Sequence, residues 1–301
     1  MNWDQAADHL FTVRDLLRFA VSAFSSHQIY FGHGYPGPTE EASYLVLHAL
    51  GLPHDQRELW LDARLLPEER RTALALVRRR VEERVPAAYL THEAWLGPFR
   101  FYVDERTIVP RSFIADALQE GLEPWIEDFD DVSRAADICT GGGSLAILLA
   151  LRCPNAQVDA VDLSPDALEV ARKNVADYGL EGRIRLHRGD LYEGLEPHQA
   201  YDLIISNPPY VDQESMASLP AEYRKEPEMA LASGPDGLDH VRRLIAEAPV
   251  HLKPGGLLVV EIGHQRAVLE AAFPEIPWVW LDLPGGDSYV FAVCREDLPG
   301  A

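Results

Sequence analysis

Apolar residues recur at helical spacing in the first part of the chain. Between His9 and Phe24 they stand three or four positions apart, at Leu10, Val13, Leu17, Val21 and Phe24. This pattern predicts an amphipathic helix. A stretch rich in glycine and proline over positions 32–38 ends that helix. Thr39 is then placed to cap a second helix, which ends at Gly51.

A third amphipathic helix is expected to start near Pro67 and to end before Pro86. Its apolar stripe consists of Leu74, Val77 and Val81. The run of arginines over positions 78–80 falls largely on the rim, where Glu82 and Glu83 can pair with it. We prefer this interpretation, a solvated helix face, to a basic binding patch. Residues 1–90 are therefore predicted to form a small helical domain.

The pattern changes after residue 90. Aromatic and β-branched residues surround Gly97 and Pro98, so a β-hairpin is predicted within residues 91–110 as a linker. Short apolar runs then alternate with helical stretches. These runs are 134–139, 157–163, 183–188, 201–206, 256–262, 278–283 and 288–294. Strands that alternate with helices predict a doubly wound α/β sheet, and we expect residues 111–301 to form the catalytic domain.

Charge restricts the class of partner. The formal net charge is −21; residues 1–110 hold 12 basic and 15 acidic side chains, whereas residues 111–301 hold 15 and 33. Nucleic-acid-binding proteins usually carry basic patches, so direct nucleic-acid binding is not expected. The acidity either serves solubility or attracts a basic protein, and the sequence leaves both open.

Apolar runs, the N-terminal segment and the cysteines indicate where the protein is located and whether it binds a metal. No apolar run approaches the length of a membrane span, and the N-terminus lacks a secretory pattern, so we expect a cytoplasmic protein without a membrane anchor. Three cysteines occur, with no CxxC or Cys/His ligand spacing, so no metal is expected. The oligomeric state cannot be predicted.

A glycine turn and two acids suggest a nucleoside site. The first strand of the sheet runs into Thr140, Gly141, Gly142 and Gly143, which precede a helical stretch. Glycines let a backbone approach a ligand closely, and a helix N-terminus supplies free N–H groups. Asp162 ends the second strand, 19 positions after Gly143, as expected of an acid that binds ribose hydroxyls. Asp190 ends the third strand and could accept from an adenine amino group.

Two other interpretations of this turn are possible. Dinucleotide oxidoreductases share the strand–turn–helix arrangement, but their fingerprint is GxGxxG, whereas the glycines here are consecutive. A purely structural tight turn would leave the two acids unexplained.

The fourth strand carries the most specific motif. It runs directly into Asn207, Pro208, Pro209 and Tyr210. Two prolines after a buried strand end the hydrogen-bond ladder and leave rigid acceptors. An amide or aromatic amino nitrogen is a weak nucleophile, because its lone pair is delocalised. The Asn207 side-chain oxygen and the Pro208 carbonyl could hold such a nitrogen in line with the methyl group of S-adenosyl-L-methionine, and Tyr210 could stack on it. Asn207, Pro208 and Tyr210 are therefore the predicted catalytic residues.

With these motifs the chain resembles the protein-glutamine N(5)-methyltransferase family over nearly its whole length. It is more similar to the branch that modifies the third large-subunit ribosomal protein than to the branch that modifies release factors. The segments that carry this resemblance are positions 30–34, 88–91, 102–106, 109–112 and 219–224, together with Cys139.

The resemblance implies a fold and an activity. The fold is a class I methyltransferase domain with a seven-stranded, mostly parallel sheet whose last strand is antiparallel, preceded by a small helical domain that recognises the substrate. The activity is methylation of a glutamine side-chain amide in that ribosomal protein, free or in assembling particles, with residues 140–143, Asp162, Asp190 and Asn207 at the cofactor. The sequence departs from the family pattern at Gly142, where serine or threonine is common, and at Lys225, where histidine is expected.

Other functions stay open at this point. A release-factor methyltransferase would share the chemistry. A nucleic-acid amino methyltransferase faces the same electronic problem, although the charge argues against it. A binding protein without catalysis is a third possibility. Arg111 and Ser112, and the segment 226–237, are equally compatible with structural roles and with roles at the site, whereas a structural role is the preferred interpretation of His33.

Overall fold

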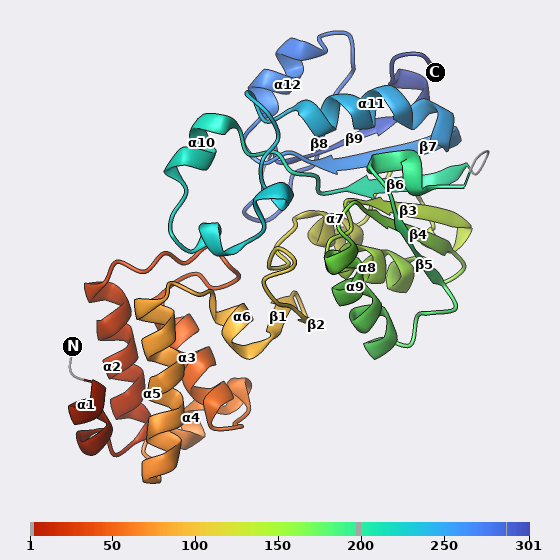
Figure 1. Cartoon of the computed structure of the whole chain (residues 1–301). Coiled ribbons are helices and arrows are strands. Elements are labelled where there is room, and N and C mark those ends of the chain that lie inside the picture. Colours follow the sequence, from red (N-terminus) through yellow and green to blue (C-terminus); the bar gives the residue numbers. More distant parts are fainter. Residues whose placement is uncertain (1–2, 197–199, 287) are drawn as a thin grey trace. The chain divides into compact units, whose positions relative to one another are not determined.

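The computed structural model describes residues 3–196, 200–286 and 288–301, which form two compact units. The first unit comprises residues up to Ala94 together with Pro220–Lys225, and the second comprises Trp95–Leu219 and Glu226–Ala301. In Figure 1 the N-terminal helices run from red to orange and the sheet unit from yellow to blue. Among the described residues, no helix combines the length and the apolar character that crossing a bilayer requires.

The first unit is helical. Its helices are α1 (Trp3–His9), α2 (Val13–Ser26), α3 (Pro38–Ala49), α4 (Arg57–Trp60), α5 (Pro67–Glu82) and α6 (Ala87–Thr91), with short 3₁₀ turns at His54–Gln56 and Tyr223–Lys225. Helices α2, α3 and α5 pack around one apolar core. The predicted stripe of α5 is confirmed, because Leu74, Val77 and Val81 are all buried there.

Two predicted helix starts are wrong, each because of a local cap. Helix α2 begins after Thr12, whose hydroxyl accepts from the backbone of Asp15 while the Asp15 carboxylate accepts from the backbone of Thr12. This capping box sets the start of α2 at Val13, although the apolar spacing already begins at Leu10. Helix α3 takes Gly37 as its N-cap and Pro38 as its first residue, so Thr39 lies inside the helix and does not cap it.

The arginine run of α5 also needs a correction. Arg78 and Arg79 form the expected exposed ion pairs with residues four positions later. Arg80 is fully buried: it donates to the Glu41 carboxylate at 2.5 Å and to the Tyr30 carbonyl at 2.8 Å. A second buried acid from far along the sequence, Glu222, accepts from Arg80 at 3.4 Å. The buried guanidinium is therefore compensated by two carboxylates and a carbonyl inside the core.

The second unit is built on a seven-stranded sheet. Its strands are β3 (Arg134–Ile138), β4 (Gln157–Asp162), β5 (Ile184–Arg188), β6 (Tyr201–Ser206), β7 (Leu252–Glu261), β8 (Val279–Trp280) and β9 (Val290–Cys294). They lie in the order β5-β4-β3-β6-β7-β9-β8, and β9 is antiparallel to β7. The predicted seven-stranded, mostly parallel sheet with an antiparallel last strand is confirmed. The predicted hairpin is also present, as β1 (Glu93–Leu96) and β2 (Phe99–Tyr102).

Helices cover both faces of the sheet (Figure 1). Helices α7 (Ile114–Glu120), α8 (Ser144–Arg152) and α9 (Pro165–Asp177) bury one apolar core against it. Helices α11 (Asp239–His251) and α12 (Arg266–Ala272) bury the other. Neighbouring residues of a strand serve opposite cores; Leu203 and Ile205 face the first, and Ile204 faces the second. The strands therefore read as continuous apolar runs, as expected for a parallel sheet buried on both faces.

The strand order places a crevice at one edge of the sheet. From β3 the chain proceeds outward through β4 to β5, then returns to the other side of β3 as β6. In open α/β sheets, ligands bind at such a switch point, outside the carboxyl ends of the strands. Helix α10 (Gln213–Ser218) and the 3₁₀ turn Glu228–Ala230 belong to the segments that follow β6.

Candidate active site

A pocket in the sheet unit collects most of the predicted site residues. Among its lining residues are Thr140, Gly141, Gly142, Asp162, Asp190 and Asn207. Gly143, Pro208 and Tyr210 do not line it, although each adjoins a residue that does. Apolar groups, including Leu163 and Met229, complete the wall. The pocket therefore joins the ends of four successive strands.

The turn after β3 is held in an unusual backbone conformation. Cys139, Gly141 and Gly143 all have positive φ angles, of 63°, 55° and 80°. At Gly143, which caps α8, a Cβ atom would lie 3.1 Å from the Cβ of Ala171, so both conformation and space favour glycine. Cys139 has no such freedom, and a left-handed non-glycine residue at a pocket is a sign of a functional constraint.

Asp162 closes this turn from the neighbouring strand. Its carboxylate accepts the backbone N–H of Gly141 at 2.8 Å and that of Ser164 at 2.9 Å. Burial raises the pKa of this carboxyl, and the backbone N–H groups oppose that shift. A carboxylate can accept about four hydrogen bonds, so capacity is left for a ligand's hydroxyls.

Asp190 also reaches the pocket, with a partner that the sequence did not reveal. Arg243 of α11 donates to its carboxylate at 2.8 Å, and both side chains are more than a third exposed. The next residue, Leu191, has a positive φ of 52° and lines the pocket as well. A ligand amino group at Asp190 would therefore meet a carboxylate whose charge is already paired.

Asn207 is positioned by the register of β3 and β6. Ile138 pairs with Ser206, and the Ser206 hydroxyl donates to the Ile138 carbonyl at 2.7 Å. Asn207 thus emerges directly beside the turn that begins at Cys139. Its side-chain oxygen is buried and has no hydrogen-bond partner among the described residues. Since a buried carbonyl is normally satisfied, this oxygen is able to accept a hydrogen bond from a ligand in the pocket.

Glu261 is a site-adjacent residue that the sequence analysis missed. It ends β7, next to the strand that carries Asn207, and accepts from the Ser112 hydroxyl at 2.5 Å, from the Phe113 backbone at 2.9 Å and from the Tyr210 hydroxyl at 3.4 Å. Burial raises the pKa of Glu261 to about 7, although its hydrogen bonds favour the ionised form. An acid directly after the apolar run Leu257–Val260 was the available signal.

Arg111 and Ser112 prove to belong to this neighbourhood. Both line the pocket. Arg111 forms a bidentate ion pair with the buried Glu226, at 2.6 and 2.8 Å. Glu226 also accepts the backbone N–H of Val109 at 2.9 Å, which ties the start of the catalytic segment to the loop after α10. His33 lies in the other unit, buried, with its ring 4.5 Å from that of Tyr223.

Fold and site together define a class. A β5-β4-β3-β6-β7-β9-β8 sheet with an antiparallel β9, a glycine turn after β3 and an acid at the end of β4 are the features of a class I methyltransferase. Comparison with family models agrees: residues 109–236 match the Methyltransferase small domain and residues 15–91 match the PrmC N-terminal domain.

Comparison with curated proteins identifies the family. The chain is 57% identical to the ribosomal protein uL3 glutamine methyltransferase of Neisseria meningitidis serogroup B, with 99% of this chain and 98% of that protein covered. It is 57% identical to the protein of that name from Burkholderia pseudomallei, with 96% of each covered, and 45% identical to that from Xanthomonas campestris pv. campestris, with 97% and 94% covered. The chain belongs to the family of ribosomal protein uL3 glutamine methyltransferases. The predicted family and branch are confirmed.

Solved structures support the fold alone. The catalytic domain of hMettl16, in complex with a MAT2A 3′UTR hairpin, aligns with a TM-score of 0.50 at 16% identity, over 75% of this chain and 80% of that one. The curated relatives and the matching methyltransferase family model make the protein an S-adenosylmethionine-dependent methyltransferase. The pocket suits that cofactor, since it offers a close backbone approach at Gly141 and Gly142, carboxylates for hydroxyl and amino groups, and an acceptor in Asn207 that is still unsatisfied.

Proposed function

We propose that this protein transfers a methyl group from S-adenosylmethionine to the side-chain amide nitrogen of a glutamine in ribosomal protein uL3. The observation that carries the proposal is the buried, unsatisfied oxygen of Asn207 at the pocket. An amide NH₂ is a donor that fits such an oxygen. The curated relatives named for this activity support the choice of substrate.

The chemistry follows from how an amide nitrogen becomes nucleophilic. Its lone pair is delocalised into the carbonyl, so it attacks only if its geometry shifts toward pyramidal. The Asn207 oxygen and the Pro208 carbonyl would each accept one N–H and hold the nitrogen in that geometry, in line with the methyl group. Pro209 has no N–H, so it leaves the end of the strand unpaired. The product loses its extra proton readily, so no strong base is needed.

Tyr210 would form one wall for the planar amide in this proposal. Its ring packs closely against Gly263, where an added Cβ would lie 2.8 Å from a ring carbon, and its hydroxyl donates to Glu261. Both contacts restrict the ring. A restricted aromatic face is suited to stacking on an amide plane.

The cofactor would occupy the turn and the two acids. We assign Thr140, Gly141, Gly142 and Gly143 to the backbone cradle, Asp162 to the ribose hydroxyls and Asp190 to the adenine amino group. The free acceptor capacity of Asp162 supports its role. The ion pair of Asp190 with Arg243 would orient its carboxylate toward the base.

We infer that the helical unit, residues 1–90 with the segment 220–225, contributes to substrate selection, and that residues 91–110 link it to the catalytic part. Glu222 accepts from Arg80 and Arg84 and from the Tyr30 backbone, so the helices hold this segment firmly. The same segment lies ten residues beyond Tyr210 along the chain. Exchange of the helical unit with that of a release-factor methyltransferase should change which protein is methylated.

The acidic composition supports a basic protein substrate. Residues 111–301 hold 33 acidic and 15 basic side chains, and proteins that bind ribosomal RNA are basic. This charge disfavours a nucleic-acid substrate. A ribosomal protein, free or in assembling particles, also implies a cytoplasmic location.

A single assay separates the possible substrates. Purified uL3, a release factor and bare DNA are offered in parallel with labelled S-adenosylmethionine, and the modified residue is mapped by mass spectrometry. Label on a glutamine of uL3 is the expected result. Label on the release factor would keep the chemistry and change the substrate, whereas label on DNA alone would overturn the amide proposal.

A further inference from the structure

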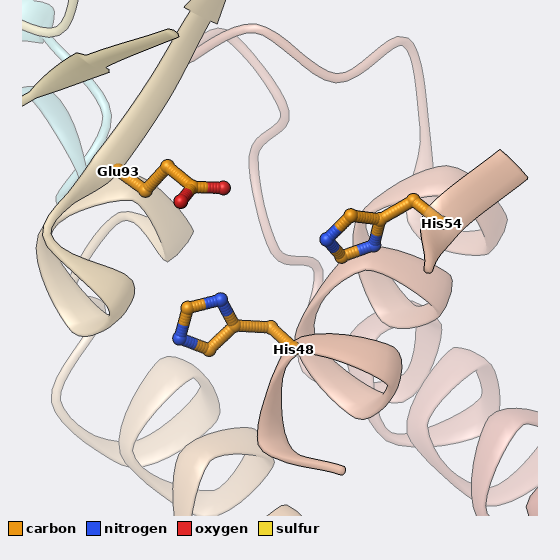
Figure 2. Close-up of side chains that lie close together, drawn as sticks. All are labelled: His48, His54 and Glu93. Atoms are coloured by element: carbon orange, nitrogen blue, oxygen red, sulfur yellow. The ribbon is translucent and has the colours of Figure 1, made fainter. Parts of the chain in front are cut away.

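Three metal-ligating side chains from separate segments meet within the helical unit. His48 lies in the last turn of α3, His54 starts the 3₁₀ turn His54–Gln56, and Glu93 is the first residue of β1. One ligand atom from each residue lies within 4.8 Å of those of the other two. Figure 2 shows both imidazole rings and the carboxylate around one shared space. The cluster is remote from the methyl-transfer motif in sequence.

A buried tyrosine supports all three side chains. Tyr44 precedes His48 by one helical turn; its ring stacks on that of His54 at 4.8 Å and lies 5.8 Å from that of His48. The Tyr44 hydroxyl donates to a Glu93 carboxylate oxygen at 3.3 Å and shares a 2.9 Å hydrogen bond with Thr91. In metal sites, the groups that orient the ligands are of this kind, with hydrogen bonds to a ligating carboxylate.

We propose that His48, His54 and Glu93 bind a divalent transition-metal ion, with Zn²⁺ the best match. Two imidazole nitrogens and one carboxylate suit Zn²⁺, Ni²⁺ or Cu²⁺, whereas Mg²⁺ and Ca²⁺ prefer sites made of oxygen alone. Three protein ligands leave the fourth position of a tetrahedral Zn²⁺ ion to water.

The three ligand atoms need to move only slightly closer together to bind a Zn²⁺ ion. Ligand atoms about 2.0–2.2 Å from Zn²⁺ lie about 3.4 Å from one another in a tetrahedral site. Side-chain rotation can supply the difference from 4.8 Å, since His54 is exposed on a short turn and His48 and Glu93 are only partly buried. The ion would join α3, the 3₁₀ turn and the start of β1, so it would stabilise the helical unit.

This proposal departs from the sequence prediction of no metal. That prediction rested on the absence of short ligand spacings, and the three ligands here are distributed over positions 48–93. Only the fold brings them together. A purely aromatic role, with both imidazoles stacked around Tyr44, is the competing explanation that the experiment must exclude.

The test uses the full chain, stripped with a chelator and titrated with Zn²⁺ by calorimetry and with Co²⁺ by visible absorption. We expect one ion per chain with a Kd of roughly 10 µM or below, a tetrahedral Co²⁺ spectrum, and a Zn²⁺-dependent rise in Tm of roughly 3 °C or more. His48→Ala, His54→Ala and the nearly isosteric Glu93→Gln should each weaken binding at least about tenfold.

Two controls make the result decisive. His9→Ala removes an exposed histidine from the same unit and should bind Zn²⁺ as the wild type does. Tyr44→Phe keeps the ring but removes the hydroxyl, so it should weaken Zn²⁺ binding while the Tm of the metal-free protein stays within a few degrees. Absence of 1:1 binding at 100 µM Zn²⁺, or binding that persists in both His54→Ala and Glu93→Gln, would overturn the proposal.

Discussion

Replacement of Asn207 by alanine should separate catalysis from stability. The side-chain oxygen of Asn207 has no protein partner among the described residues, so its removal breaks no hydrogen bond of the folded state. It also removes a buried, unsatisfied carbonyl, whose presence is itself unfavourable. We therefore expect the Tm of Asn207→Ala to lie within about 2 °C of the wild type.

The catalytic effect should be much larger. Loss of one preorganised hydrogen-bonding group that acts on the transition state typically lowers kcat by about 10²–10³-fold, or about 3–4 kcal/mol. Asn207 would act on the reacting nitrogen itself, so the loss should appear mainly in kcat. Affinity for S-adenosylmethionine should change by less than about threefold, because the glycine turn and Asp162 are untouched.

Three measurements on the same preparation decide the matter: single-turnover methyl transfer to uL3, calorimetric titration with S-adenosylmethionine, and thermal unfolding. Asn155→Ala is the matched control, because Asn155 is exposed and donates to the Asp130 carbonyl, away from the pocket. The reasoning is refuted if kcat falls less than tenfold, or if the loss of rate is accompanied by an equal loss of cofactor affinity.

Three further substitutions test the residues that surround the pocket of Asn207. Gly143→Ala puts a Cβ 3.1 Å from that of Ala171 at a φ of +80°, so calorimetry should show weaker cofactor binding and urea unfolding a loss of about 1–3 kcal/mol; unchanged values would contradict this. Glu261 has a pKa raised to about 7, so the folded state binds more protons than the unfolded state between pH 4.5 and 7 and the free energy of unfolding falls with rising pH there, by on the order of 3 kcal/mol. Glu261→Gln should remove that component in urea titrations from pH 4.5 to 8, and parallel curves for the two proteins would exclude it. Glu226→Ala leaves Arg111 without its bidentate partner and should lower the free energy of unfolding by about 3 kcal/mol, whereas a loss below 1 kcal/mol would show that the pair contributes little.

The sequence could predict those features of the fold and the site that are determined by residues close together along the chain. The run from Tyr201 to Ile205 is apolar except for Asp202, and prolines follow shortly after it, so the sequence indicated both the strand and its end. The consecutive glycines showed where the tight turn after β3 lies. These features are short-range, and the structure confirms the strands around them.

Ion-pair partners that lie far apart along the chain could not be predicted from the sequence. Arg80 stands in the same run as Arg78 and Arg79, whose acidic partners four positions later are visible in the sequence. Its actual partners, Glu41 and Glu222, lie 39 and 142 positions away, so no periodicity could indicate them. The same reason hid the pair of Asp190 with Arg243, and the exact helix starts were hidden by caps that outweighed the apolar pattern.

The strained turn after β3 is best understood through the position of that strand. β3 lies between β4 and β6 in the middle of the sheet and is paired along both edges. A central strand cannot relax to relieve the left-handed conformation of Cys139, because any shift would break its register with both neighbours. The sheet thus holds Cys139, Gly141 and Gly143 in place, and the same register fixes Asn207 beside them. The proposed cofactor turn and the proposed amide acceptor are therefore both positioned by one strand, so we expect a change of strain at the turn to alter methyl transfer as well as cofactor affinity.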